Sequence, residues 1–234
     1  MNHWRLYGAI SVAAVALFLA GCGGSIFRST KVINDPLTLR GRSASVDVGL
    51  TGDALACEFT VDTPVDPADP AQAMLSYDFG NTLIGDAPLQ PYEGMESLDL
   101  SQKVRIRFQF TPNTSMPNEF TLRNVNLRIW LRLKDTDAEG ASRSLTPIQM
   151  SYSGTLTLKR QVDGSYQPDG DMAFTISMNK QEGWSLLNLL ASGDANTAVV
   201  ALSLRAETSS TNVPPGATAR LTVEFAEGSA RVLW

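Results

Sequence analysis

Histidine is almost absent from this chain of 234 residues, since His3 is the only one. It lies within the first 21 residues, which have the features of a secretory signal. A mature chain without imidazole cannot use a Ser-His-Asp or Cys-His nucleophile, and it cannot build a metal site on histidine. The sequence therefore predicts a protein that is not an enzyme and that carries no cofactor.

Cysteine is also scarce, with only Cys22 and Cys57 present. Cys57 alternates with Phe59 and Val61, so we expect its side chain on the apolar face of a strand. Free cysteine is among the most often buried residue types. Should Cys22 be modified, Cys57 is the single thiol left and no internal disulfide can form.

No hydrophobic run in the chain is long enough for a permanent membrane span. The longest, Leu6–Ala20, has about 15 uncharged, mostly apolar residues, whereas a spanning helix needs roughly 20. Arg5 precedes this run and small residues follow it, which is the layout of a cleaved secretory signal. We predict that residues 1–21 are a signal peptide.

The end of that segment reads Leu19-Ala20-Gly21-Cys22 and resembles the lipobox of bacterial lipoproteins. The resemblance covers only the first 22 residues. It implies cleavage before Cys22, a diacylglycerol on the Cys22 thiol, and a fatty acyl chain such as palmitate on the new amino group. Two or more chains give stable membrane attachment. In that family an Asp after the cysteine favours the inner membrane; Gly23 stands here, so the resemblance implies the outer membrane in a host with two membranes.

Positive charge is in deficit, which bears on the partners that the protein can have. The whole chain carries −5, and the signal holds one charged side chain, Arg5, so the mature part carries −6. Proteins that bind nucleic acids are usually basic, so no nucleic acid is expected as a partner.

Residues 22–30, beginning Cys22-Gly23-Gly24-Ser25, have the composition of a flexible lipidated tether. Residues 31–234 are long enough for one large domain, with two smaller ones as the alternative.

Strict alternation of apolar and polar residues dominates the mature chain. In Lys103–Phe110 the apolar residues from Val104 to Phe110 share one face, and in Asn124–Lys134 those from Val125 to Leu133 do the same. Such alternation predicts strands with one buried and one exposed face, typical of antiparallel sheets. Shorter alternating runs lie on both sides of these two.

Two segments near the C-terminus depart from this simple pattern. Trp184–Ala191 has a helical period, with Gly193 as a plausible stop. Leu221–Phe225 and Arg231–Trp234 flank Glu227-Gly228, which predicts a terminal hairpin. Together these patterns predict an all-β, antiparallel two-sheet β-sandwich with one short helix; the alternative is a closed β-barrel.

Six cationic side chains and one tryptophan fall on the outward faces of the two clearest strands. If those strands pair, the residues form a patch suited to an anionic glycan, a lipid head group or an acidic protein. The alternative is a solvated face whose cations are balanced by neighbouring carboxylates. The candidate patch comprises Lys103, Arg105, Arg107, Arg128, Trp130, Arg132 and Lys134.

Two acidic patterns are weaker candidates. Asp135, Asp137 and Glu139 resemble the start of a calcium loop, but Thr146 replaces the glutamate that an EF-hand requires at its twelfth position. A polar hairpin tip explains the pattern without metal. Paired carboxylates could also hydrolyse glycosides without histidine, but the sequence cannot place the glutamates in space. The glutamates considered are Glu58, Glu93, Glu96, Glu119, Glu207 and Glu224.

The sequence thus predicts a lipid-anchored protein of the cell envelope that serves as a non-enzymatic binding or structural module facing the periplasm or the cell surface. Its partners would be the membrane, through the anchor, and an envelope protein or an anionic glycan. The alternative function is a carboxylate-based glycoside hydrolase in the envelope.

Overall fold

Twelve β-strands and one α-helix make up the part of the chain that this computed structural model describes. The described residues are 30–53, 55–64, 73–78, 92, 94–136, 142–144, 147–191 and 195–234. The predicted signal peptide and Cys22 lie outside these ranges. Within the described ranges, no helix is long and apolar enough to cross a membrane.

The strands vary greatly in length. The long ones are β5 (Ser97–Thr111), β6 (Glu119–Thr136), β8 (Ile148–Arg160), β11 (Ala195–Ser209) and β12 (Thr218–Leu233). The shorter ones are β1 (Thr30–Asn34), β2 (Ser43–Gly52), β3 (Ala56–Asp62), β4 (Leu75–Asp78), β7 (Ser142–Ser144), β9 (Tyr166–Pro168) and β10 (Met172–Asn179). The helix, α2, spans Lys180–Ala191.

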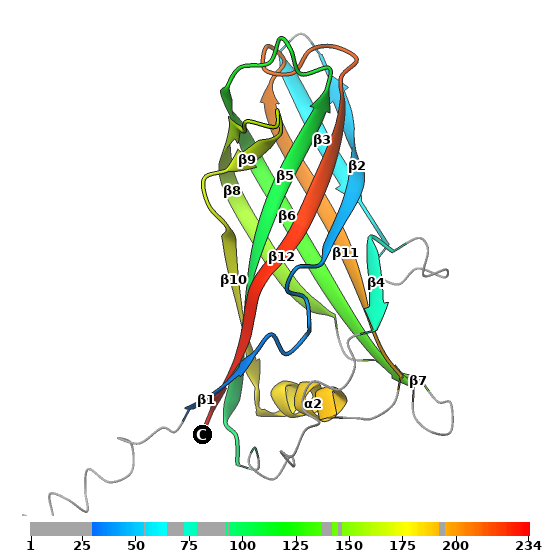
Figure 1. The fold of residues 1–234 in the computed structure, drawn as a ribbon, viewed down its shortest axis with the longest axis vertical. Helices are drawn as coiled ribbons and strands as arrows, with labels where there is room; N and C mark the ends of the chain where they lie inside the picture. The colour runs from blue at the N-terminus through cyan, green and yellow to red at the C-terminus, as the bar shows by residue number, and fades with distance from the viewer. Residues whose placement is uncertain are drawn as a thin grey trace, which may run out of the picture.

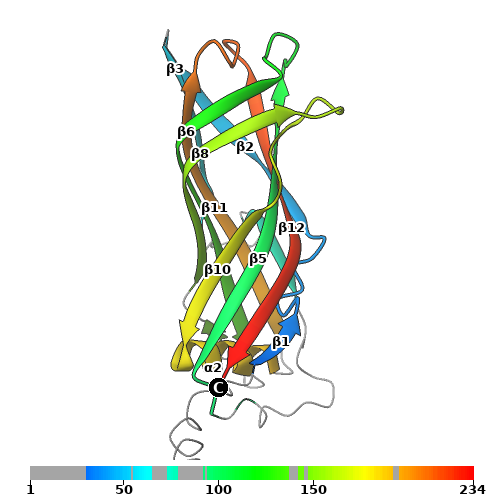
Figure 2. The same ribbon diagram turned by 90° about the vertical axis from the view of Figure 1, so that its left-hand side faces the viewer.

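Backbone pairing joins eight of these strands into a closed ring, in the order β12-β2-β3-β11-β6-β8-β9-β5 and back to β12. Every pairing is antiparallel. Strands β1, β4, β7 and β10 are added at the edges of this ring. The ring is long and narrow, as Figures 1 and 2 show. The ring has its shortest strand pairing at β9, which pairs with β5 at one position, where Tyr166 lies opposite Phe108.

These pairings confirm the predicted all-β antiparallel class and match the closed barrel, which was the alternative arrangement. The two-sheet sandwich is not confirmed, because hydrogen bonds connect all the described strands into one sheet. The physical reason lies in the long strands: all of them except β8 pair along most of their length with neighbours on both sides, so the twisted sheet curls until β5 meets β12.

The interior is filled by the apolar sides of the strands, as the alternation predicts. Val104, Ile106, Phe108 and Phe110 of β5 are at most 1% exposed. Aromatic rings occupy the half of the barrel around β9, where Phe110 lies 5.6–6.2 Å from each of four other rings, measured between centroids. Those rings belong to Phe59, Phe108, Phe120 and Tyr166. This half of the barrel is therefore a packed core.

Helix α2 closes the opposite end of the barrel (Figure 1). It begins one turn earlier than the predicted Trp184–Ala191, because Asn179 caps it. The Asn179 side-chain oxygen accepts hydrogen bonds from the amides of Gln181 and Glu182, at 2.9 and 3.0 Å, and the Glu182 carboxylate accepts one from the Asn179 amide at 3.1 Å. This is a reciprocal capping box. Leu186, Leu187, Leu189 and Leu190 are buried against the barrel end.

The predicted terminal hairpin is wrong. Residues 218–233 form one strand, β12, which pairs with β5 on both sides of a register shift between Phe225 and Gly228. Glu227-Gly228 is thus a bulge rather than a turn. A bulge and a turn both place glycine between apolar runs, and here the continuous partner strand β5 keeps the two runs in line.

Both described chain ends lie at the helix-capped end. Strand β1 pairs with the last part of β12, so that Thr30 lies opposite Leu233. Figures 1 and 2 show β1, the C-terminus and α2 together at the lower end of the barrel.

Candidate functional site

The predicted cationic patch is divided between two separate parts of the barrel. Lys103, Arg105 and Arg107 lie on β5, and Arg128, Trp130, Arg132 and Lys134 lie on β6. The two strands do not pair, and β8 and β9 separate them along the shorter way round the ring. The outward orientation was predicted correctly, but the pairing on which a single patch depended does not occur.

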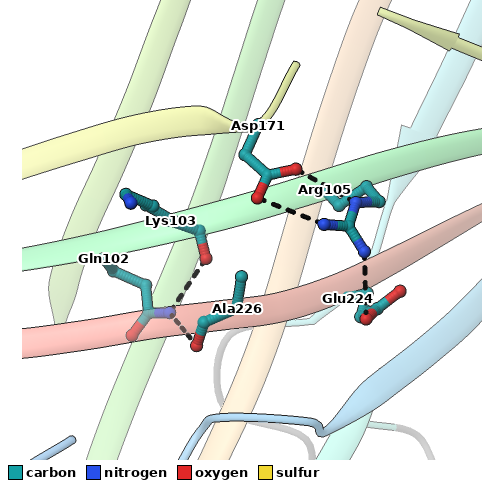
Figure 3. A network of polar contacts seen from close by, with 6 residues as sticks. All are labelled: Gln102, Lys103, Arg105, Asp171, Glu224 and Ala226. Atoms are coloured by element: carbon teal, nitrogen blue, oxygen red, sulfur yellow. Dashed lines mark hydrogen bonds and ion pairs between the residues drawn. The ribbon is translucent and has the colours of Figure 1, made fainter.

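The β5 cations are balanced by carboxylates from neighbouring segments. Arg105 forms a two-pronged contact with Asp171, at 3.0 and 3.3 Å, and also lies 3.4 Å from the Glu224 carboxylate on β12 (Figure 3). Arg107 contacts Asp163 at 3.3 Å, and Lys103 contacts Glu227 at 2.9 Å. The hydrogen bond to Glu227 and its charge raise the pKa of Lys103, while Lys103 lowers the pKa of Glu227. This half therefore follows the alternative interpretation of a balanced, solvated face.

Gln102, which is only 3% exposed, explains the bulge beside this face. Its amide nitrogen lies 2.9 Å from the Lys103 carbonyl oxygen and 3.4 Å from that of Ala226 (Figure 3), and it also lies 3.4 Å from the Glu227 carbonyl oxygen. A Cβ at Gly228 would lie 2.5 Å from the Gln102 side-chain oxygen, so any larger residue there would require the Gln102 side chain to move. Carbonyl groups freed by the bulge thus regain a donor, and the glutamine has a structural role.

The surroundings of the cations on β6 differ from those of the cations on β5. Arg128 is exposed, between Ser203 of β11 and Ser151 of β8, and the described residues show no carboxylate paired with it. The Trp130 indole is half-buried and donates a hydrogen bond of 3.2 Å to the side chain of Gln149. Arg132 and Lys134 are half-buried on the same face.

A shallow pocket of about 380 Å³ adjoins Arg128 on the outside of β3, β11 and β6. Its polar lining includes Asn126, Asp62 and Arg205, and Arg205 lies 3.5 Å from the Glu58 carboxylate. Sugar hydroxyls and acidic groups accept hydrogen bonds from amide, hydroxyl and guanidinium groups, and these three kinds of donor lie side by side here. This face, which we call the β6 face, is defined by Asn126, Arg128, Trp130, Gln149, Ser151 and Ser203.

The calcium candidate cannot be built from described side chains. Asp137 and Glu139 lie outside the described residues, and for Asp135 the structure describes the backbone alone, paired with Arg143. The flanking strands β6 and β7 are antiparallel neighbours, which agrees with a hairpin tip. Across the described ranges, no group of three or more His, Cys, Asp or Glu residues could hold a metal ion.

Three of the six glutamates considered for glycoside hydrolysis each contact a cation or an amide at the surface. Glu58 pairs with Arg205, Glu224 pairs with Arg105, and Glu207 accepts a hydrogen bond from Asn124 at 3.1 Å. Glu93 lies outside the described residues, and none of the described Asp or Glu residues is buried. The alternative function gains no support from these groups.

Cys57 lies where its alternation predicts. Its side chain is 6% exposed on the inner face of β3, and burial raises the pKa of the thiol. Leu55, just before β3, is 83% exposed because the chain bends there. A buried neutral thiol is a poor nucleophile, so its role is that of a small apolar side chain.

An aromatic cluster at the α2 end is the feature that the sequence analysis missed. The rings of Tyr92 and Trp234 stack, with centroids 6.3 Å apart, and the Lys31 ammonium lies 4.6 Å from the centre of the Tyr92 ring. Beside them is a mainly apolar pocket of about 470 Å³, lined by Tyr92, Gly94, Met95, Lys180, Gln181 and Trp184. The aromatic cluster and the pocket lining together come from four separate stretches of sequence, at Lys31, 92–95, 180–184 and Trp234, so no local pattern could have grouped them.

Comparison with known proteins gives no family. No family model matches the chain, and no curated protein matches it. Solved viral structures align over most of the chain with very low scores. One is "Structure of infectious bursal disease virus Gx strain", with 11% identity and a TM-score of 0.15 over 89% of this chain and 41% of that chain. Another is "Cryo-EM structure of Mud crab tombus-like virus at 3.3 Angstroms resolution", with 10% identity and a TM-score of 0.14 over 89% of this chain and 90% of that chain. The chain spans about two fifths of the first of these, and likeness at this level carries no argument about fold or function.

Proposed function

We propose that this protein is a lipid-anchored component of the cell envelope whose barrel serves as a non-enzymatic binding module. The observation that carries the proposal is the lipobox-like Leu19-Ala20-Gly21-Cys22, which ends eight positions before the first strand, β1. Eight residues reach at most about 29 Å when fully extended. An acylated Cys22 would therefore hold the barrel beside the bilayer, in the outer membrane if the host has two.

Replacing Cys22 by alanine should abolish attachment. In cells fed a labelled fatty acid such as palmitate, the wild-type protein should carry the label and sediment with membranes. The Cys22→Ala protein should carry no label and should leave the membrane fraction, because a protein with one acyl chain or none is not held stably at a membrane. Cys57→Ala is the matched control, since Cys57 is buried inside the barrel, and it should keep the label. Label on Cys22→Ala, or none on wild type, would refute the anchor.

For the binding role, the β6 face supports an anionic glycan or an acidic protein surface as partner. Its exposed Arg128 lies among hydroxyl and amide groups and beside the Trp130 ring, which is the combination that recognises acidic sugars. The β5 cations already have carboxylate partners, so they offer less net attraction to an anion. The proposal therefore assigns recognition to β6.

Substituting Arg128 by serine should weaken retention on an immobilised acidic polysaccharide such as heparin. Loss of one exposed charge contact is worth about 0.2–1 kcal/mol, or up to roughly fivefold in affinity. The control is Arg107→Ser, an equal change of charge on β5 at a residue paired with Asp163. Equal weakening by the two variants would mean that only net charge matters and that the β6 face is not a site.

A further inference from the structure

We infer that the α2 end of the barrel is a membrane-contact face, which sits in the interfacial layer of a zwitterionic phospholipid bilayer. The face comprises Lys31, Lys180, Trp184 and Trp234, which lie next to the buried side chains of Tyr92 and Met95. This inference rests on the proposed lipid anchor at Cys22 and adds to it which end of the barrel meets the lipid.

Distance decides the orientation. Thr30 lies opposite Leu233 at the α2 end, and Cys22 precedes Thr30 by eight residues. That length of chain reaches at most about 29 Å. The 16 residues of β12 run from this end toward the other and cover roughly 50 Å of strand at about 3.3 Å per residue. A tether of this length brings the α2 end to the bilayer and leaves the opposite end out of reach.

The side chains at this end have the chemistry of an interfacial surface. Trp184 and Trp234 are half-buried, so each exposes part of its ring, and Tyr92 is stacked on Trp234. Tryptophan and tyrosine concentrate at the boundary between hydrocarbon and head groups. The adjoining pocket of about 470 Å³ is mainly apolar and offers space for part of a lipid chain.

Charged groups surround the aromatic rings without giving the face one dominant sign. Lys31 lies over Tyr92 and Lys180 lines the pocket, where their long side chains can extend to lipid phosphates. Glu182 is on the same helix, but its carboxylate accepts the Asn179 amide in the helix cap. Two lysines beside one carboxylate suit a head group that carries both a phosphate and an amine, such as phosphatidylethanolamine.

Tryptophan quenching provides the test, because the chain after residue 21 has only three tryptophans, and Trp130 lies on the outer wall of β6 rather than among the residues of this face. The lipidated protein is reconstituted into phosphatidylethanolamine–phosphatidylcholine vesicles with or without lipids brominated near the head of the acyl chain. Three variants each keep one tryptophan: Trp130→Phe/Trp234→Phe keeps Trp184, Trp130→Phe/Trp184→Phe keeps Trp234, and Trp184→Phe/Trp234→Phe keeps Trp130.

Brominated lipid should remove most of the emission of Trp184 and Trp234 and leave that of Trp130, on the outer wall of β6, nearly unchanged. The two membrane-face variants are assessed separately, so failure of one to fold leaves the other comparison intact. Vesicles that carry the protein but quench all three tryptophans equally, or none, would overturn the face and keep the anchor. Protein that fails to float with vesicles would overturn the anchor and this inference with it.

Discussion

Phe110→Ala should lower the free energy of unfolding by about 3–5 kcal/mol, the range for emptying a buried phenylalanine site. Phe110 is 1% exposed and contacts four rings in the half of the barrel around β9. The neighbouring rings belong to four different strands or loops of one closed sheet, so they cannot easily collapse into the space. For a domain of this size each kcal/mol lowers the melting temperature by about 2–4 °C, and thermal unfolding measures the loss.

The control for that experiment is Val162→Ala. Val162 is a large apolar residue that is fully exposed in the turn after β8, so shortening it leaves no cavity. Its melting temperature should stay within experimental error of wild type. A Phe110→Ala protein that melted like Val162→Ala would show that the aromatic half of the barrel is not a close-packed core.

Gly183→Val should destabilise the protein by about 1–3 kcal/mol through overpacking. Gly183 lies on the buried side of α2, and a Cβ there would come within 2.9 Å of Leu98 Cβ and 3.2 Å of Met95 Cε. Leu98 Cβ is fixed to the backbone of β5 and cannot move aside, so the helix must shift away from the barrel end. Urea unfolding would measure the cost.

Asn188→Val separates this clash from the general effect of valine in a helix. Asn188 is exposed on the same helix, and asparagine and valine have similar helix propensities. This control should unfold at nearly the wild-type urea concentration. Equal destabilisation by both variants would mean that valine weakens α2 itself and that α2 does not press closely on β5. Because Trp184 follows Gly183 directly, a shifted helix should also change its fluorescence spectrum.

Side-chain direction on β5 and β6 was predictable from sequence, and so were these two strands. Alternation in Lys103–Phe110 assigned every inward and outward residue of that part of β5 correctly, and the same holds for Val125–Leu133 on β6. The burial of Cys57 followed from the same rule. The start of α2 was predicted four residues late because its first turn, Lys180–Gly183, is polar and lacks an apolar period.

Partner strands were not predictable, and the patch shows the consequence. The cations of β5 and β6 point outward as expected, yet β8 and β9 lie between the two strands and the β5 cations meet Asp163, Asp171, Glu224 and Glu227 instead. Each of these carboxylates is more than 50 positions away in sequence. Local patterns hold no record of such distant contacts.

The sequence by itself determined the period-two faces, the all-β class and the expectation of an acylated Cys22, because each depends on neighbouring residues only. The tertiary structure decided that the sheet closes on itself, that β12 passes through Glu227-Gly228 as one strand, and that Tyr92, Trp184 and Trp234 gather at one end. Those features depend on which segments meet across long stretches of chain, and that choice is made by packing of the whole barrel.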